Sequence, residues 1–302
     1  MEKSVFQNKI PTLLPDIMIR YGEPMANHTS FRIGGPAAVM AFPKNAQELA
    51  DILKASNQLG IQPVILGAGT NVLAPDEGMD RLVICLKDCM DGMELLGDGC
   101  IRVAAGVTMA RAAVFAANNG LSGMEFAHGI PGTVGGGVYM NAGAYGGEIA
   151  DICQSVDVMT MDGQMKTLSC EQMGFSYRHS VLEECNGIVV SVVFCLTHGN
   201  KEQIREKMQE LMEKRKTSQP LDKPSAGSAF KRPVGGYAAA LIDQAGLKGY
   251  QIGGAAISEK HAGFVVNLGG ATARDVNNLL TEVARKVKEN SGITIEPEIR
   301  VW

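Results

Sequence analysis

Apolar side chains recur every three or four residues in four segments of the chain, the spacing that places them on one face of an amphipathic helix. The first segment begins with Asn45 and carries Glu48 three residues later, which is the pattern of a capping box. Glycine or proline follows each apolar stripe and marks where the helix ends. The sequence therefore predicts helices over residues 45–60, 108–120, 201–219 and 272–292.

Strand patterns lie between and after these helices. Several short runs rich in Val, Ile and Leu are typical of buried strands. Two further runs flank Asp162-Gly163, a dipeptide that favours a hairpin turn. The final residues alternate strictly between apolar and polar side chains, as in a strand with one buried face. The predicted strands cover residues 63–67, 81–86, 101–106 and 187–196, the hairpin covers 156–168, and the last strand covers 293–302.

The order of these elements predicts a fold of mixed α and β class. Helix and strand alternate over the first 120 residues, which is typical of α/β units. A length of 302 residues is typical of two or three domains. Residues 219–227 contain two prolines and a glycine and are expected to form a loop between domains.

Composition and charge narrow the functional classes. A net charge of −4 provides no basic surface, so a nucleic-acid partner is not expected. No apolar run reaches the length of a membrane helix, and the N-terminus lacks the apolar core of a signal peptide, so we expect a soluble cytoplasmic protein. Seven cysteines without a C-x-x-C pair predict buried free thiols in a reducing compartment. His198 and His261 lack metal-ligand spacing, and no metal is expected.

Two glycine-rich segments need a physical reason, because glycine costs backbone entropy. Residues 129–148 hold eight glycines in twenty positions, and residues 66–71 read LGAGTN after a predicted strand. Val72 stands where a dinucleotide fingerprint needs glycine, and the chain has no Gly-Lys dipeptide for a P-loop. Runs of backbone N–H groups without side chains can still bind a diphosphate. Tight packing of loops is the alternative.

Seven short motifs support the ligand interpretation by their order, and they lie at residues 27–35, 66–73, 129–148, 175–180, 224–233, 258–267 and 296–300. Together they resemble the UDP-N-acetylenolpyruvoylglucosamine reductases, flavoenzymes of peptidoglycan precursor synthesis. Each motif alone is weak, but the resemblance covers essentially the whole chain. The short spacing here resembles the branch of the family that lacks an extra substrate-covering loop with a tyrosine.

The resemblance implies an α/β (α+β) fold of the vanillyl-alcohol-oxidase (PCMH) type. Two FAD-binding subdomains, residues 1–80 and 81–200, would precede a C-terminal α/β substrate-binding domain over residues 201–302. FAD would be held non-covalently, and His28 and His128 would pack or form hydrogen bonds. The residues expected to hold FAD are Leu66, Gly67, Ala68, Gly69, Thr70, Asn71, Gly129, Ile130, Pro131, Gly132, Thr133, Gly135, Gly136, Asn141, Gly143 and Ala144.

The resemblance also implies the catalytic residues. Arg178 would grip the substrate carboxylate, because a guanidinium binds a carboxylate through two parallel hydrogen bonds. Ser228 would donate a proton to the substrate α-carbon. Glu298 would act as a neutral acid beside the developing negative charge, with Glu296 as a rival on the same face. Further substrate contacts are expected from Tyr177, Arg215 and Lys231.

The implied reaction uses NADPH as hydride donor. It reduces the enolpyruvyl ether of UDP-N-acetylglucosamine enolpyruvate to UDP-N-acetylmuramate. Two alternatives stay open at this point: another FAD oxidase or dehydrogenase of the same fold that acts on a small alcohol or hydroxy acid, and a nucleotide-sugar-binding module without catalysis. The sequence does not determine the oligomeric state, and a monomer is compatible with it.

Overall fold

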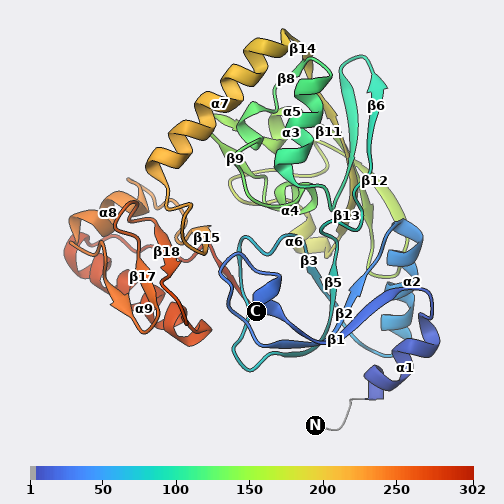
Figure 1. Ribbon diagram of the computed structural model, residues 1–302, viewed down its shortest axis with the longest axis horizontal. Coiled ribbons are helices and arrows are strands. Elements are labelled where there is room, and N and C mark those ends of the chain that lie inside the picture. Colours follow the sequence, from blue (N-terminus) through green and yellow to red (C-terminus); the bar gives the residue numbers. More distant parts are fainter. Residues whose placement is uncertain (1–4) are drawn as a thin grey trace. The chain divides into compact units, whose positions relative to one another are not determined.

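The computed structural model describes residues 5–302 and divides them into two compact units, each discontinuous in sequence (Figure 1). Each unit has its own hydrophobic core. The division into three consecutive parts that the sequence suggested stays a prediction. The first unit comprises the described residues up to Tyr21 together with Ala38–Ala68 and Arg81–Glu213, and the second comprises Gly22–Ala37, Gly69–Asp80 and Lys214–Trp302.

A five-stranded antiparallel sheet lies at the centre of the first unit, in the order β12–β11–β13–β7–β6. Its middle strand β13 is apolar almost throughout, because both of its faces are covered. The predicted hairpin at Asp162-Gly163 joins β11 and β12, and Gly163 adopts a φ of +81° there. The strands are β6 (Met93–Gly97), β7 (Cys100–Ala104), β11 (Cys153–Met159), β12 (Met165–Ser169) and β13 (Ile188–Cys195).

Helices α3 (Met109–Asn118) and α4 (Val134–Tyr139) contact one another, and α4 also contacts β13 and β7. Thr108 caps α3 by accepting a 3.3 Å hydrogen bond from the N–H of Arg111. The glycine tract therefore contains a helix that packs on the central sheet. Shorter elements nearby are β8 (Leu121–Ser122), η2 (Glu125–Ala127), β9 (Gly143–Ala144), β10 (Gly147–Glu148), α5 (Ile149–Ile152), α6 (Leu182–Cys185) and β14 (Thr197–His198).

A second sheet has the order β1–β2–β5–β3, and its strands β3 and β5 run parallel. Helix α2 begins as predicted, because the Asn45 side chain accepts a 2.9 Å hydrogen bond from the N–H of Glu48. Gly60, with a φ of +65°, follows its end. The elements are α1 (Val5–Leu13), β1 (Met18–Pro24), η1 (Met25–Asn27), β2 (Pro36–Phe42), α2 (Ala46–Gln58), β3 (Val64–Leu66) and β5 (Met79–Cys85).

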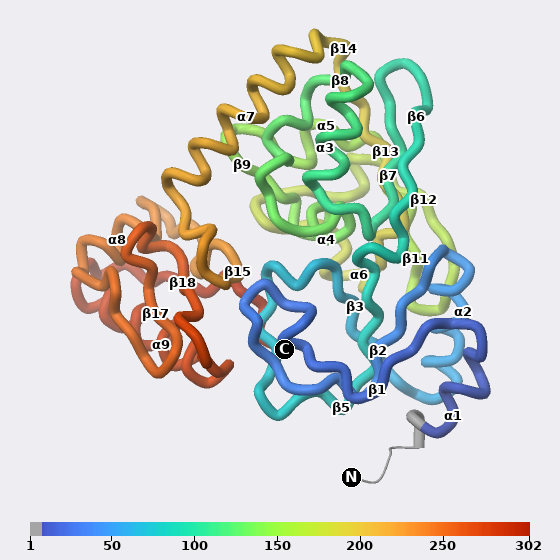
Figure 2. Tube along the Cα trace, in the orientation of Figure 1, coloured from blue at the N-terminus to red at the C-terminus, as the bar shows by residue number. Residues whose placement is uncertain are grey.

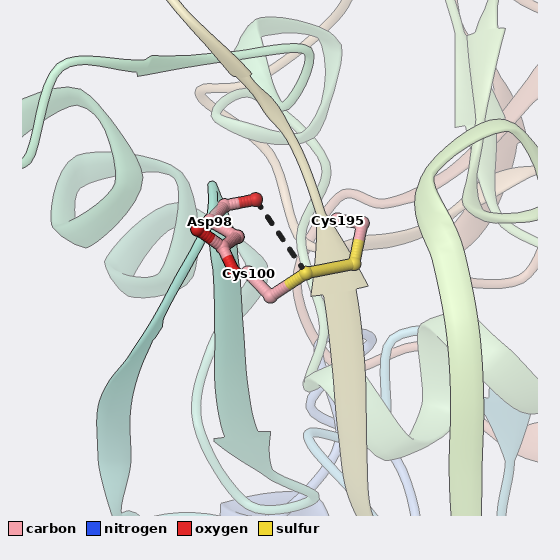
Figure 3. Close-up of a disulfide and its surroundings, with 3 residues drawn as sticks. All are labelled: Asp98, Cys100 and Cys195. Carbon is pink, nitrogen blue, oxygen red and sulfur yellow. Dashed lines mark hydrogen bonds between the residues drawn. A yellow bond between two sulfur atoms is a disulfide. The ribbon is translucent and has the colours of Figure 1, made fainter.

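The cysteines correct the expectation that all are buried free thiols. Cys100 and Cys195 lie opposite one another on β7 and β13, and their sulfur atoms form a disulfide (Figure 3). Direct cross-strand neighbours bring their Cβ atoms close enough for this bond, which the sequence separation of 95 residues conceals. Cys185 is exposed. Burial raises the pKa of the Cys153 thiol to about 12.

The second unit is built on a four-stranded antiparallel sheet in the order β15–β18–β17–β16. Helix α9 contacts β16 and β17, and α8 contacts α9. These elements belong to the orange and red part of the tube in Figure 2. Thr272 and Asp275 form a capping box at the start of α9. The elements are β4 (Val72–Leu73), α7 (Lys201–Ser218, which begins in the first unit), β15 (Ser225–Ser228), α8 (Ala238–Gln244), β16 (Gln251–Ile252), β17 (Ala255–Ile257), β18 (Phe264–Asn267), α9 (Ala273–Ser291) and β19 (Arg300–Val301).

The predicted strand over residues 293–302 is mostly wrong. Only Arg300–Val301 (β19) is a regular strand, and it pairs in parallel with β4. Pro297 supplies no N–H for a ladder, and the segment instead makes isolated backbone hydrogen bonds to the chain after β15. The side-chain alternation still places Ile295 and Ile299 in the core.

Candidate active site

The two glycine-rich segments meet in the first unit. Leu66 ends β3, and a Cβ atom on the next residue, Gly67, would lie only 2.5 Å from the Thr133 hydroxyl oxygen. Thr133 stands at the N-terminus of α4 and accepts a 3.4 Å hydrogen bond from the Gly136 N–H. The expected cofactor-binding segments are therefore neighbours, although Gly67 and Thr133 are 66 positions apart in sequence.

Gly69 lies at the centre of the GAGTN turn, and contacts within the protein, without any ligand, already require a glycine at this position. Its φ is +60°, and a Cβ atom there would lie 2.1 Å from the carbonyl oxygen of His28. Its own carbonyl accepts a 3.0 Å hydrogen bond from the Ser30 N–H. Ser30 was not among the predicted site residues, although it lies in the motif at residues 27–35.

Backbone donors remain available in the GAGTN turn. Among residues 5–302, no oxygen accepts a hydrogen bond from the N–H of Gly67, Ala68 or Gly69. In the glycine tract, by contrast, the N–H groups of Val134 and Gly135 donate to the carbonyls of Val107 and Ala105, in the turn that follows strand β7. The concentration of unused donors that suits a diphosphate therefore lies at residues 67–69.

Packing explains several glycines of the tract, which modifies the expectation that the whole tract exists to approach a ligand. A Cβ atom on Gly135 would lie 2.9 Å from that of Ala105, and one on Gly137 would lie 2.9 Å from the Met109 sulfur. Gly136 is different, because it is exposed and a Cβ atom there would meet only the Thr133 hydroxyl at 3.6 Å. Gly136 is therefore the helical glycine that leaves space for a ligand.

The remaining expected cofactor residues surround this helix. The carbonyl of Gly132, which has a φ of +134°, accepts a 3.0 Å hydrogen bond from the Met109 N–H. Ile130 packs against the core, and Gly143 and Ala144 form strand β9. Gly129 and Pro131 complete the loop between η2 and α4.

His128 carries a buried polar atom without a partner. Its Nδ1 has no hydrogen-bond partner within the described part of the chain, and burial lowers the pKa of the imidazole. A desolvated nitrogen of this kind costs free energy unless a ligand or water satisfies it. Together with the unused donors of residues 67–69 and the open side of Gly136, it fits a large polar cofactor such as FAD.

Arg178 lies in a tight turn that the glycine tract supports. Its φ is 56°, and its guanidinium lies 5.2 Å from the centre of the Tyr177 ring. The Asn141 side chain, at the end of α4, donates a 3.1 Å hydrogen bond to the carbonyl of Ser176. The Ser180 hydroxyl donates a 2.8 Å hydrogen bond to the carbonyl of Tyr139. Asn141 therefore has a definite structural role, and it places Arg178 beside the glycine tract.

Ser228 and Glu298 come together in the second unit. The Glu298 N–H donates a 2.8 Å hydrogen bond to the carbonyl of Ala229, the residue after Ser228. Ser228 is exposed and Glu298 is half-buried. The Asn71 amide, from the end of the GAGTN turn, donates a 3.3 Å hydrogen bond to the Glu298 carbonyl. The backbone thus brings two of the three expected catalytic residues to one corner of the unit.

The other expected substrate residues differ in their exposure to solvent. Lys231 is exposed, and its ammonium lies 3.7 Å from the Glu296 carboxylate. Glu296, the rival of Glu298, is therefore occupied by an ion pair at the surface. Arg215 is only 9% exposed and lies near the end of α7.

Comparison with known proteins gives consistent results. The C-terminal domain of UDP-N-acetylenolpyruvoylglucosamine reductase matches residues 219–302, and an FAD binding domain matches residues 36–169. The UDP-N-acetylenolpyruvoylglucosamine reductase of Streptococcus pneumoniae (strain Hungary19A-6) is 45% identical over 98% of this chain and 97% of its own length. The reductase structure from Thermus caldophilus superposes with a TM-score of 0.80 at 38% identity, over 95% of this chain and 98% of that one. An alkyldihydroxyacetonephosphate synthase, 15% identical with a TM-score of 0.50, covers 66% of this chain and 41% of its own and shares the fold alone.

The fold and the FAD-binding match define an FAD-dependent oxidoreductase. The 45% identity over 98% of the chain is more specific, and the chain belongs to the UDP-N-acetylenolpyruvoylglucosamine reductase family. The expected fold class and family are confirmed, and both alternatives, another FAD oxidase and a binding module without catalysis, lose their support. The roles of individual residues stay predictions.

Proposed function

We propose that this protein reduces the enolpyruvyl ether of UDP-N-acetylglucosamine enolpyruvate to UDP-N-acetylmuramate with NADPH. The observation that carries the proposal is the 45% identity to a reductase of that name over 98% of the chain. The proximity of Ser228 and Glu298 and the packing of the Arg178 turn on the glycine tract are compatible with it.

The residues that would hold FAD are those of the GAGTN turn and the segment 129–144. The N–H groups of residues 67–69 would donate to its diphosphate, and the Nδ1 of His128 would meet another polar atom of the cofactor. The bound cofactor would supply the hydride chemistry that links NADPH to the methylene carbon of the substrate. The protein binds and orients the reactants and provides the proton.

Three side chains would act on the substrate. Arg178 would bind the carboxylate through its planar guanidinium, and would stabilise the negative charge that spreads into this group during hydride addition. Ser228 would donate its hydroxyl proton to the carbon next to the carboxylate, where the new C–H bond forms. Its exposure leaves the hydroxyl accessible to a substrate. Glu298, in its neutral form, would donate a hydrogen bond to the same developing charge.

Two anaerobic half-reactions test this function. NADPH should bleach the flavin absorbance of the purified FAD-loaded protein, and UDP-N-acetylglucosamine enolpyruvate should then restore it with formation of UDP-N-acetylmuramate. A flavin that NADPH reduces but the enolpyruvyl substrate does not reoxidise would contradict the proposal. Reoxidation by a small hydroxy-acid product instead would favour the other FAD dehydrogenases of this fold.

The place of action is part of the proposal. Within the described residues, no helix is both long and apolar enough to cross a bilayer. We propose that the reaction takes place in the cytoplasm, as a step of peptidoglycan precursor synthesis. Tyr177, Arg215 and Lys231 are proposed as further substrate contacts.

A further inference from the structure

The segment Lys231–Tyr237, which follows the Ser228 strand, exposes two large apolar side chains. Val234 is 98% exposed and Tyr237 is 62% exposed. Cβ atoms built on Gly235 and Gly236 would meet no atom within 4 Å. The segment therefore stands clear of the rest of its unit, and its aromatic ring is open to a ligand.

Both ends of this segment are fixed. The Lys231 N–H donates a 2.8 Å hydrogen bond to the Glu296 carbonyl, and Phe230 forms a β-bridge with Pro297. At the other end, the Tyr237 carbonyl accepts hydrogen bonds of 3.0 and 3.1 Å from the first turn of α8. Six residues span at most about 20 Å, so Tyr237 stays within that distance of Lys231, whose N–H is bonded to the carbonyl of Glu296, two residues before Glu298.

The Tyr237 ring has a cation on one side. The Arg232 guanidinium lies 4.0 Å from the ring centre, the position of a cation–π contact. A planar ring beside a positive charge is complementary to a nucleotide, because the ring can stack on a base and the cation can attract a phosphate. The ring keeps enough exposed surface for a planar ligand to cover.

We propose that Tyr237 stacks on the pyrimidine base of the sugar-nucleotide substrate. This inference rests on the proposed function, which places the enolpyruvyl group at Ser228 and Glu298. The base lies at the opposite end of such a substrate, beyond the sugar and the diphosphate. The surface that binds the base must therefore lie near Ser228 but apart from it. Tyr237, which ends the segment that follows the Ser228 strand, meets this condition.

The test uses the FAD-loaded protein and titration calorimetry with two ligands, UDP and inorganic diphosphate. Tyr237→Ala should weaken UDP binding about 5- to 150-fold, which corresponds to the 1–3 kcal/mol of base–aromatic stacking. Diphosphate binding should not change, because this ligand has no base. Tyr237→Phe should behave as wild type, since it keeps the ring. Leu268→Ala is the matched control, because Leu268 is a 45% exposed apolar residue of the same unit outside the segment.

Turnover provides a second measurement. Tyr237→Ala should raise KM for the enolpyruvyl substrate by the same factor and leave kcat unchanged, as expected when a contact is equal in the ground state and the transition state. Wild-type UDP affinity in Tyr237→Ala would overturn the proposal, and so would an equal loss for UDP and diphosphate. If the wild-type protein neither binds UDP nor is reoxidised by the enolpyruvyl substrate, the proposed function itself is wrong.

Discussion

Replacing His128 by alanine tests whether the cofactor satisfies the buried imidazole nitrogen. Nδ1 has no partner within the described residues, so its burial costs about 1–3 kcal/mol until a ligand provides a hydrogen bond. If FAD provides that bond, His128→Ala should weaken FAD binding about 5- to 150-fold. In the apoprotein, His128→Ala removes no hydrogen bond of Nδ1 to the described residues, so we expect no loss of unfolding free energy from this source.

Flavin fluorescence titration of the apoprotein measures the FAD affinity directly, and urea unfolding measures the apoprotein. His198→Ala is the control, because His198 is an exposed histidine of the same unit. Burial lowers the pKa of His128, because it disfavours the charged imidazole, so FAD affinity in the wild type should fall as the pH decreases through that lowered pKa. Unchanged FAD affinity in His128→Ala, with pH dependence intact, would refute the reasoning.

Four other changes have separate expected outcomes. Ser228→Ala should slow reoxidation by the enolpyruvyl substrate about 10²–10⁴-fold and leave reduction by NADPH within a few-fold, as stopped-flow absorbance will show; equal slowing of both steps would argue against a proton donor. Arg178→Lys should slow the same reoxidation about 10²–10³-fold, because lysine keeps the charge but loses the planar fork, and normal turnover would remove Arg178 from the site. Gly69→Ala should destabilise the apoprotein to urea more than Gly60→Ala, since both positions have φ near +60° but only Gly69 would strike a backbone oxygen; equal losses would show that φ alone matters. Hydrogen bonding from the Thr272 N–H lowers the pKa of Asp275, so the carboxylate form stabilises the folded protein. Asp275→Asn should therefore lower the free energy of unfolding near pH 7, and this difference should disappear as the pH falls below 3.8 through the folded pKa. A difference that grows in acid would contradict this expectation.

Local signals in the sequence were sufficient for the four predicted helices, which are α2, α3, α7 and α9; the shorter helices, among them α4 and α8, were not predicted. Three of these helices begin at capping residues, which are Asn45, Thr108 and Thr272, and end before a left-handed glycine. Such signals act only on neighbouring residues, so a short stretch of sequence is enough to recognise them. The prediction of the final strand was mostly wrong, because a strand depends on residues that are distant in sequence. Alternation at Ile295 and Ile299 predicted which side chains are buried, but a strand also needs a partner and an N–H at each ladder position, and Pro297 has none.

The sequence also singled out the two glycine-rich segments and the residues of the family motifs, because these are properties of composition and order. It could not assign each glycine. Gly135 and Gly137 are small because α4 lies close to Ala105 and Met109, whereas Gly136 faces open space, and only the packing of the helix on the sheet separates these cases. The disulfide between Cys100 and Cys195 was missed for the same physical reason, since the register of β7 against β13 decides which side chains face one another. The hydrogen bond from Glu298 to Ala229 likewise joins residues distant in sequence, so the corner that holds Ser228 and Glu298 exists only in the folded chain.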